Sequence, residues 1–108
     1  MPRLHLLNQA GQELPQPRHI SPDVVESGCW LVSIERAEAM IGFPIHLHRR
    51  KAEPAFLSGV VSAYRRENYT SPTGRPTMRT VFTFTPGPDD QAVTDSSGWT
   101  PAGVKFVS

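Results

Sequence analysis

The residues best suited to metal chemistry lie in one short stretch of the chain, residues 42–64. His46 and His48 are separated by a single residue, so both imidazoles point to the same face of an extended strand. Glu53 follows five positions after His48. Two histidines and a nearby carboxylate are suitable ligands for iron, manganese or zinc. This spacing therefore indicates one half of a metal site.

The same stretch also indicates a phosphate-binding surface, because three consecutive cations, residues 49–51, follow His48 directly. Residues 49–79 hold seven cations against two carboxylates, a net charge of +5. Residues 1–48 (three cations, five carboxylates) and 80–108 (one cation, three carboxylates) each carry −2. A positive patch attracts phosphate through its local field, even where the whole chain carries only +1. A solvated strand face with a flexible turn is the alternative interpretation.

Composition limits the class of protein. A chain of 108 residues has the length of one domain. Its eleven prolines and eight glycines favour short strands and turns over several long helices. No apolar run approaches the roughly 20 residues of a membrane span, and Met1–Leu7 is too short for a signal peptide. Cys29 is the only cysteine, which excludes an internal disulfide. We expect a cytoplasmic protein with no membrane partner.

Apolar alternation and turn residues predict a mostly β (α+β) domain. The strands expected are residues 3–7, 29–34, 45–49, 56–66, 77–85 and 103–107. A one-turn helix should begin at Ser21-Pro22-Asp23, and a second helix should span residues 35–41, with Ser33 as its N-cap and Gly42 at its end. The strands at 56–66 and 77–85 should pair across a hairpin.

These elements predict a small antiparallel β-barrel of five to six strands with one or two short helices. Residues 1–108 form one domain in this prediction. Residues 1–27 are an N-terminal extension with an irregular proline-containing segment, and residues 28–107 are the barrel. Trp30 lies on a strand with two apolar faces and should be buried in the core. Gly59 in the middle of a strand indicates a bulge or the close approach of another backbone.

The order of several residues resembles the PUA-like superfamily, and within it the EVE-type domains. The resemblance rests on Trp30, the helix at 35–41, Gly42, the strand containing His48, and the segment from Gly59 to Tyr64. A narrower pattern resembles a set of small bacterial domains. It consists of Gly42, Leu47-His48, Lys51, Pro54, Gly59, Tyr64-Arg65, residues 81–84 and Gly98-Trp99. The resemblance covers roughly residues 28–107 and implies a PUA-like barrel that binds RNA or DNA, with recognition of a modified base.

Arginines can hold a nucleic-acid backbone, and exposed aromatic rings can stack bases for roughly 1–3 kcal/mol each. The residues expected to contact nucleic acid are Arg49, Arg50, Lys51, Tyr64, Arg65, Arg66 and Tyr69. The residues expected at a ligand pocket are Trp30, His46, His48 and Trp99. Because residues 45–50 and 56–66 should be neighbouring strands, we expect the cations at 49–51 and 65–66 to share one surface.

Two other functions remain open. The pattern His46-x-His48-x4-Glu53-x5-Gly59 resembles one motif of the cupins, in which a metal would be held by His46, His48 and Glu53 with help from His5 or His19. Pro86-Gly87-Pro88 occupies the place of the second cupin motif, but the histidine that this motif requires does not follow it. A protein–protein adaptor is the other alternative. The chain has no Gly-x-Ser-x-Gly, phosphate-cradling glycine loop or paired catalytic acids. We therefore expect a non-catalytic module without a cofactor.

Overall fold

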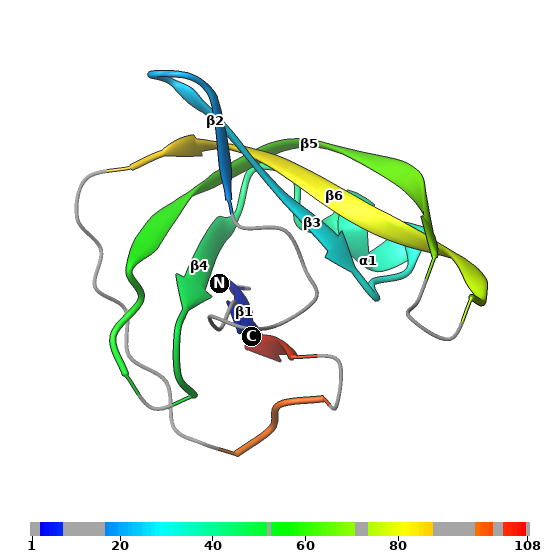
Figure 1. The fold of residues 1–108 in the computed structure, drawn as a ribbon. Coiled ribbons are helices and arrows are strands. Elements are labelled where there is room, and N and C mark those ends of the chain that lie inside the picture. Colours follow the sequence, from blue (N-terminus) through cyan, green and yellow to red (C-terminus); the bar gives the residue numbers. More distant parts are fainter. Residues whose placement is uncertain are drawn as a thin grey trace.

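The computed structural model describes residues 3–7, 17–51, 53–70, 74–87, 97–100 and 103–107, and within them it contains seven strands and one helix (Figure 1). The elements are β1 (Arg3–Leu7), β2 (Arg18–Ser21), β3 (Val24–Trp30), α1 (Ile34–Ala39), β4 (Pro44–His48), β5 (Leu57–Thr70), β6 (Pro76–Pro86) and β7 (Val104–Val107). The prediction of a mostly β domain is confirmed. The side chain of Cys29 lies outside the described residues.

All seven strands belong to one mixed sheet with the order β2-β3-β6-β5-β4-β1-β7. Neighbouring strands are antiparallel except β1 and β4, which are parallel. The sheet is curled, so that β5 and β6 arch over β4 and β1 (Figure 1). Within the described residues β2 and β7 are the two edges of the sheet, so its closure into a barrel stays a prediction.

The N-terminal segment differs from the prediction. Ser21 ends β2, and Pro22-Asp23 form the turn to β3 instead of the start of a helix. The Asp23 backbone N–H donates to the Ser21 hydroxyl at 3.3 Å, a local bond that suits a tight turn as well as a helix start. The predicted strand at 29–34 begins earlier, at Val24, and ends at Trp30. β1 also lies inside the sheet, between β4 and β7, and is therefore no extension of it.

The predicted helix is present as α1, close to the expected range. The Ser33 hydroxyl accepts a hydrogen bond from the Arg36 backbone N–H at 3.3 Å, as expected of an N-cap. Ala37 and Met40 are buried against the core. Gly42 follows the helix with φ of +87°, a conformation that favours glycine, and its N–H donates to the Val61 carbonyl at 2.8 Å.

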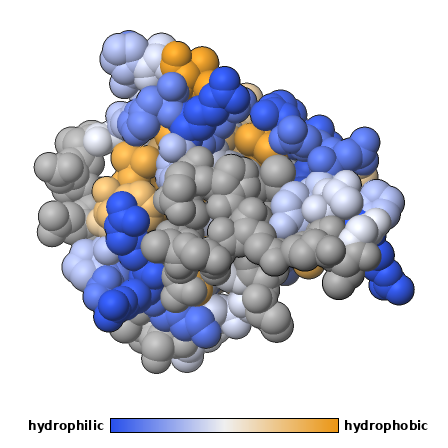
Figure 2. Space-filling view, in the orientation of Figure 1, coloured by the Kyte–Doolittle hydropathy of each residue, from blue (hydrophilic) through white to orange (hydrophobic). Residues whose placement is uncertain are grey.

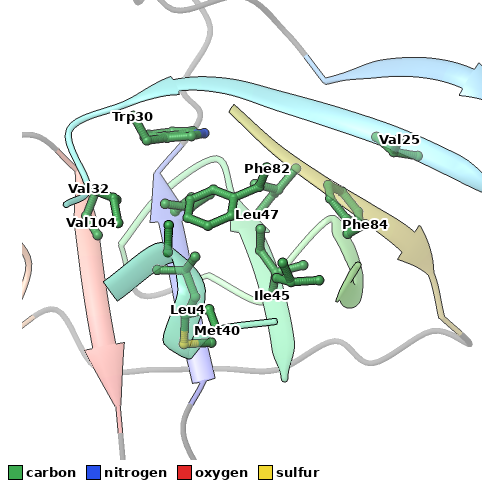
Figure 3. Close-up of a cluster of buried hydrophobic side chains, with 13 residues drawn as sticks. Leu4, Val25, Trp30, Val32, Met40, Ile45, Leu47, Phe82, Phe84 and Val104 are labelled. Carbon is green, nitrogen blue, oxygen red and sulfur yellow. The ribbon is translucent and has the colours of Figure 1, made fainter. Parts of the chain in front are cut away.

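The core lies inside the curl of the sheet. Trp30 is fully buried, packs with Phe82 and Leu47, and donates its indole N–H to the Ser27 hydroxyl at 2.9 Å (Figure 3). The predicted core role of Trp30 is confirmed. Its predicted place in a ligand pocket is wrong, because no face of the ring is open to a ligand. The buried hydrophobic cluster contains Leu4, Leu6, Val25, Trp30, Val32, Ala37, Met40, Ile45, Leu47, Val61, Phe82, Phe84 and Val104.

The predicted hairpin between β5 and β6 is confirmed, and Gly59 marks a close approach within it. Gly59 stands opposite Pro86 in the ladder. A Cβ atom at Gly59 would lie 2.6 Å from Cδ2 of Phe84 and would collide with the Thr85 carbonyl oxygen. The backbone of β6 therefore occupies the space that a side chain would need.

We predict that Gly59→Val destabilises the protein by roughly 1–3 kcal/mol, although valine favours strands, because it overpacks this contact. Asn68→Val, at an exposed position of the same strand, is the matched control and should change the free energy of unfolding by less than about 0.5 kcal/mol. Trp30→Ala should lower the free energy of unfolding by about 3–5 kcal/mol, because it leaves a cavity in the core. Urea unfolding measures all three. Equal stabilities of Gly59→Val and Asn68→Val would contradict the close approach.

Candidate functional site

A group of polar side chains is buried on the face of β1 and β4 that points away from the core. The parallel register pairs His5 with His46 and Leu7 with His48. Side chains alternate along a strand, so Leu4 and Leu6 face the core while the histidines face the other side. Across the neighbouring strands, Lys105 pairs with His5 and Ser58 pairs with His46. The resulting histidine cluster consists of Arg3, His5, His46, His48, Ser58 and Lys105.

Hydrogen bonds fix the tautomers of His48 and His5 in their neutral forms. Nδ1 of His48 lies 2.8 Å from the Glu53 carbonyl oxygen, which can only accept, so Nδ1 carries the proton. Nε2 of His48 is then an acceptor. Nδ1 of His5 lies 2.8 Å from it and must donate. We call this chain, from His5 through His48 to the Glu53 carbonyl, the histidine relay.

His46 is held by a separate pair of hydrogen bonds. The Arg3 guanidinium can only donate, and its Nη1 lies 2.9 Å from Nε2 of His46. Nδ1 of His46 therefore donates to the Ser58 hydroxyl, at 2.8 Å. The His5 ring lies between the other two, with centroids 4.9 Å from His46 and 5.0 Å from His48. His5, His46 and His48 are only 3%, 1% and 0% exposed, so the three rings form one packed unit.

Burial and neighbouring positive charge oppose protonation of the relay. The pKa of His5 is lowered to about 3, chiefly by burial and then by electrostatic interaction with His46, His48, Lys105 and Arg3, in that order. Burial also lowers the pKa of His48, although the bond to the Glu53 carbonyl partly offsets this effect. Both rings are therefore neutral at neutral pH, which preserves the tautomers of the relay.

The predicted metal ligands are not brought together. The Glu53 carboxylate is exposed and lies 3.8 Å from Arg50, and only the Glu53 backbone carbonyl reaches His48. His5 does lie beside His46 and His48, whereas His19 lies elsewhere, in the pocket described next. Among the residues that the structure describes, no three histidine, cysteine, aspartate or glutamate side chains are placed to hold a metal ion.

A pocket of about 320 Å³ opens where the start of β2 approaches the connection between β4 and β5. Its lining residues are Pro17, His19, Arg49, Phe56 and Leu57. The Arg49 guanidinium lies over the Phe56 ring, 4.3 Å from the ring centroid. In the described part of the chain, the side chains of Arg49 and His19 make no hydrogen bond or ion pair. This Arg49 pocket therefore presents unused donors beside apolar walls.

The other predicted nucleic-acid contacts are mostly engaged in the fold. Arg65 pairs with Glu26 at 3.4 Å and with Glu67 at 3.0 Å. Arg66 donates to the Val32 carbonyl and the Thr80 hydroxyl, both at 2.7 Å. The Tyr64 hydroxyl donates to the Glu38 carboxylate at 2.8 Å, and the Tyr69 ring lies 5.0 Å from the guanidinium carbon of Arg79.

The expected single basic surface is wrong, because β5 continues far beyond β4. The ladder pairs Leu47 with Leu57, and Arg49 lies beyond that pair. Arg65 lies eight residues further along β5 in the opposite direction, which is roughly 26 Å of strand. The cations at 49–51 and 65–66 therefore occupy different parts of the molecule.

Of the predicted pocket residues, His46, His48 and Trp99 are near one another. The Trp99 ring lies edge-on to His48 at 5.7 Å and to His5 at 6.4 Å. Trp30 packs in the core with Leu47, whose side chain points away from His46 and His48. Trp30 therefore lies on the other side of β4 from these histidines. The sequence pattern indicates His5 only as a substitute metal ligand and indicates no site role for Phe56. An aromatic residue seven positions after Arg49, across a loop, was the available signal for the stacked pair.

Comparison of the chain with protein-family models, curated proteins and solved structures found no significant match. Among the described residues, no helix is long and apolar enough to span a membrane.

We predict that the relay makes the protein sensitive to acid. An unfolded histidine has a pKa near 6.5, whereas that of folded His5 is about 3, so the unfolded chain binds more protons between these values. Stability is therefore full above pH 6.5 and falls as the pH drops toward 3, by up to about 1.4 kcal/mol per pH unit from His5. Urea unfolding at several pH values measures this slope.

The matched variants are His5→Leu, which removes the buried titrating group, and Asn68→Val, which changes an exposed side chain that does not titrate. His5→Leu should reduce the fall in the free energy of unfolding below pH 6.5, and Asn68→Val should leave this fall as in the wild type. The same slope in all three proteins would rule out His5 as the source.

Proposed function

We propose that this protein is a small non-catalytic module that binds single-stranded nucleic acid at the Arg49 pocket. The observation that carries the proposal is the Arg49 guanidinium, stacked at 4.3 Å on Phe56 with its hydrogen-bond donors unused by described residues. A guanidinium can stack on a base with its free face and donate a planar pair of bonds to phosphate at the same time. Arg49 supplies both contacts at the edge of a pocket.

The surroundings of Arg49 fit a nucleotide. Pro17, Phe56 and Leu57 give the pocket apolar walls for the flat face of a base, and His19 adds an imidazole that can donate to phosphate. Arg50 and Lys51 are exposed next to Arg49 and extend the positive charge along the loop. The exposed pair between Arg50 and Glu53, at 3.8 Å, is weak and can be exchanged for a phosphate contact.

A single strand fits this pocket better than a duplex. A base must be unstacked to enter a pocket of about 320 Å³, and single strands present their bases without the cost of opening pairs. The proposal retains the resemblance of residues 28–107 to PUA-like, EVE-type domains of bacteria. On that basis the curled sheet is a PUA-like barrel, the protein acts in the cytoplasm, and the base in the pocket is a modified one.

The surface gives less support to an adaptor function. On the face in Figure 2, exposed apolar residues form small separate patches among hydrophilic ones. A protein partner usually binds a larger continuous apolar patch. Among the described residues, the large exposed apolar side chains lie in several different parts of the fold; they are Ile20, Leu31, Ile34, Ile41, Val60 and Met78.

The test measures fluorescence anisotropy of labelled single-stranded DNA and RNA, with duplexes for comparison. We expect single strands to bind more tightly, and the affinity to fall between about 50 mM and 200 mM salt with a log–log slope near −2, because three cations contact phosphate. Arg49→Ala should lower the affinity for the single strand by about tenfold or more. Its melting temperature should equal that of the wild type.

Arg36→Ala is the matched control, because Arg36 also lies over a phenylalanine ring, Phe106, at 4.7 Å, but lies outside the pocket. Its affinity should equal that of the wild type. Arg49→Lys keeps the charge but loses the planar stack, and should bind at an intermediate level. Absence of binding to every nucleic acid at low salt, or equal loss in Arg36→Ala and Arg49→Ala, would contradict the proposal.

A further inference from the structure

The histidine relay ends in the loop that forms the Arg49 pocket. His48 is the last residue of β4, and Arg49 follows it directly. The Glu53 carbonyl that accepts from His48 lies in the middle of the loop between β4 and β5. A buried side chain therefore bonds to the backbone of the loop whose exposed side chains line the pocket.

Packing holds the end of this loop, where Ala55 is buried and Phe56 packs against the core and under Arg49. The Phe56 N–H donates to the Leu47 carbonyl at 2.9 Å, which fixes the far end of the loop. The Glu53 N–H lies 3.4 Å from the Arg50 carbonyl, a long bond, and the Arg50–Glu53 side-chain pair is exposed. The bond from His48 to Glu53, at 2.8 Å, is thus the shortest described hydrogen bond to the middle of the loop.

We propose that His48 is a positioning residue of the Arg49 pocket. Its Nδ1–H holds the Glu53 carbonyl, and this bond fixes the loop so that Arg49 stays stacked on Phe56. The effect on ligand binding rests on the proposed function, whereas the effect on the loop does not. His48 itself lies on the buried face of β4 and touches no lining residue through its ring nitrogens.

The Glu53 carbonyl requires the proton on Nδ1 of His48, and the bond to His5 is consistent with this tautomer. Only the Nδ1–H tautomer of His48 can donate to Glu53, and the N–H of His5 requires Nε2 of His48 to be bare. The groups around the pair are Arg3 and His46 on β1 and β4, Lys105 on β7 and the edge of Trp99. A second proton on either ring would put N–H groups on both nitrogens of the His5–His48 contact and break the bond. Arg3 and Lys105 are cations, so they oppose this protonation.

Two substitutions at His48 separate the two hydrogen bonds. The amide nitrogen of asparagine takes the place of Nδ1, so His48→Asn keeps the donor to Glu53 and loses the acceptor for His5. The amide of glutamine reaches the place of Nε2, so His48→Gln keeps the acceptor for His5 and loses the donor to Glu53. Each variant loses one buried hydrogen bond, so the two should have similar stabilities.

Limited trypsin digestion reports the loop without any ligand, because Arg49, Arg50 and Lys51 are all trypsin sites. We expect cleavage at these three sites, identified by mass spectrometry, to be at least about fivefold faster in His48→Gln than in the wild type. His48→Asn should be cleaved like the wild type. Affinity for the labelled single strand should fall about tenfold in His48→Gln and little in His48→Asn.

Equal cleavage rates in the two variants would overturn the positioning role, whatever the binding data show. Faster cleavage of His48→Gln would support the positioning role even if the wild type binds no nucleic acid. In that case the proposed function would be wrong. If neither variant folds, imidazole ¹⁵N shifts of the wild type at pH 7 decide the matter. A protonated Nδ1 of His48 supports the relay, and a protonated Nε2 with bare Nδ1 overturns it.

Discussion

The parallel pairing of β1 with β4 is the interaction on which the rest of the structure depends. It joins residues 41 positions apart in the chain, and each of its two faces has a different role. One face supplies Leu4, Leu6 and Leu47 to the hydrophobic core, which drives the pairing through burial of apolar surface. The other face brings His5 beside His46 and His48. The histidine cluster therefore forms at no additional cost in chain ordering, because the core already fixes its backbone.

The polar face of this pair links the folded interior to the surface loop. Three buried imidazoles are tolerated because the nitrogens of His46 and His48, and Nδ1 of His5, have hydrogen-bond partners, and because burial keeps the His5 and His48 rings neutral. From His48 the hydrogen bonds continue to the loop that carries Arg49. A rigid interior behind a loop with exposed cations is a suitable arrangement for binding, because less order must be gained when a ligand arrives.

Local signals in the sequence predicted the local structure well. The alternation in β5 and β6, the Ser33 cap and the mid-strand Gly59 each depend on residues close in the chain or across a hairpin, and each is found in the structure. The Ser21-Pro22-Asp23 pattern suits both a helix start and a turn, and the antiparallel pairing of β2 with β3 makes it a turn. No short turn connects the parallel strands β1 and β4, so the sequence carries no local signal for their pairing. The contact of His48 with His5 could therefore not be predicted. The length of β5, which separates Arg49 from Arg65, was likewise set by pairing with β6.

The central claim is that the Arg49 pocket, rather than the β5–β6 hairpin, is the binding surface. Titration of ¹⁵N-labelled protein with a single-stranded oligonucleotide, followed by amide chemical shifts, tests this claim most directly. We expect the largest changes at residues 17–19, 49–51 and 56–57, around the pocket. Changes confined to residues 65–70 and 75–79, where the hairpin carries Tyr69 and Arg79, would contradict the account.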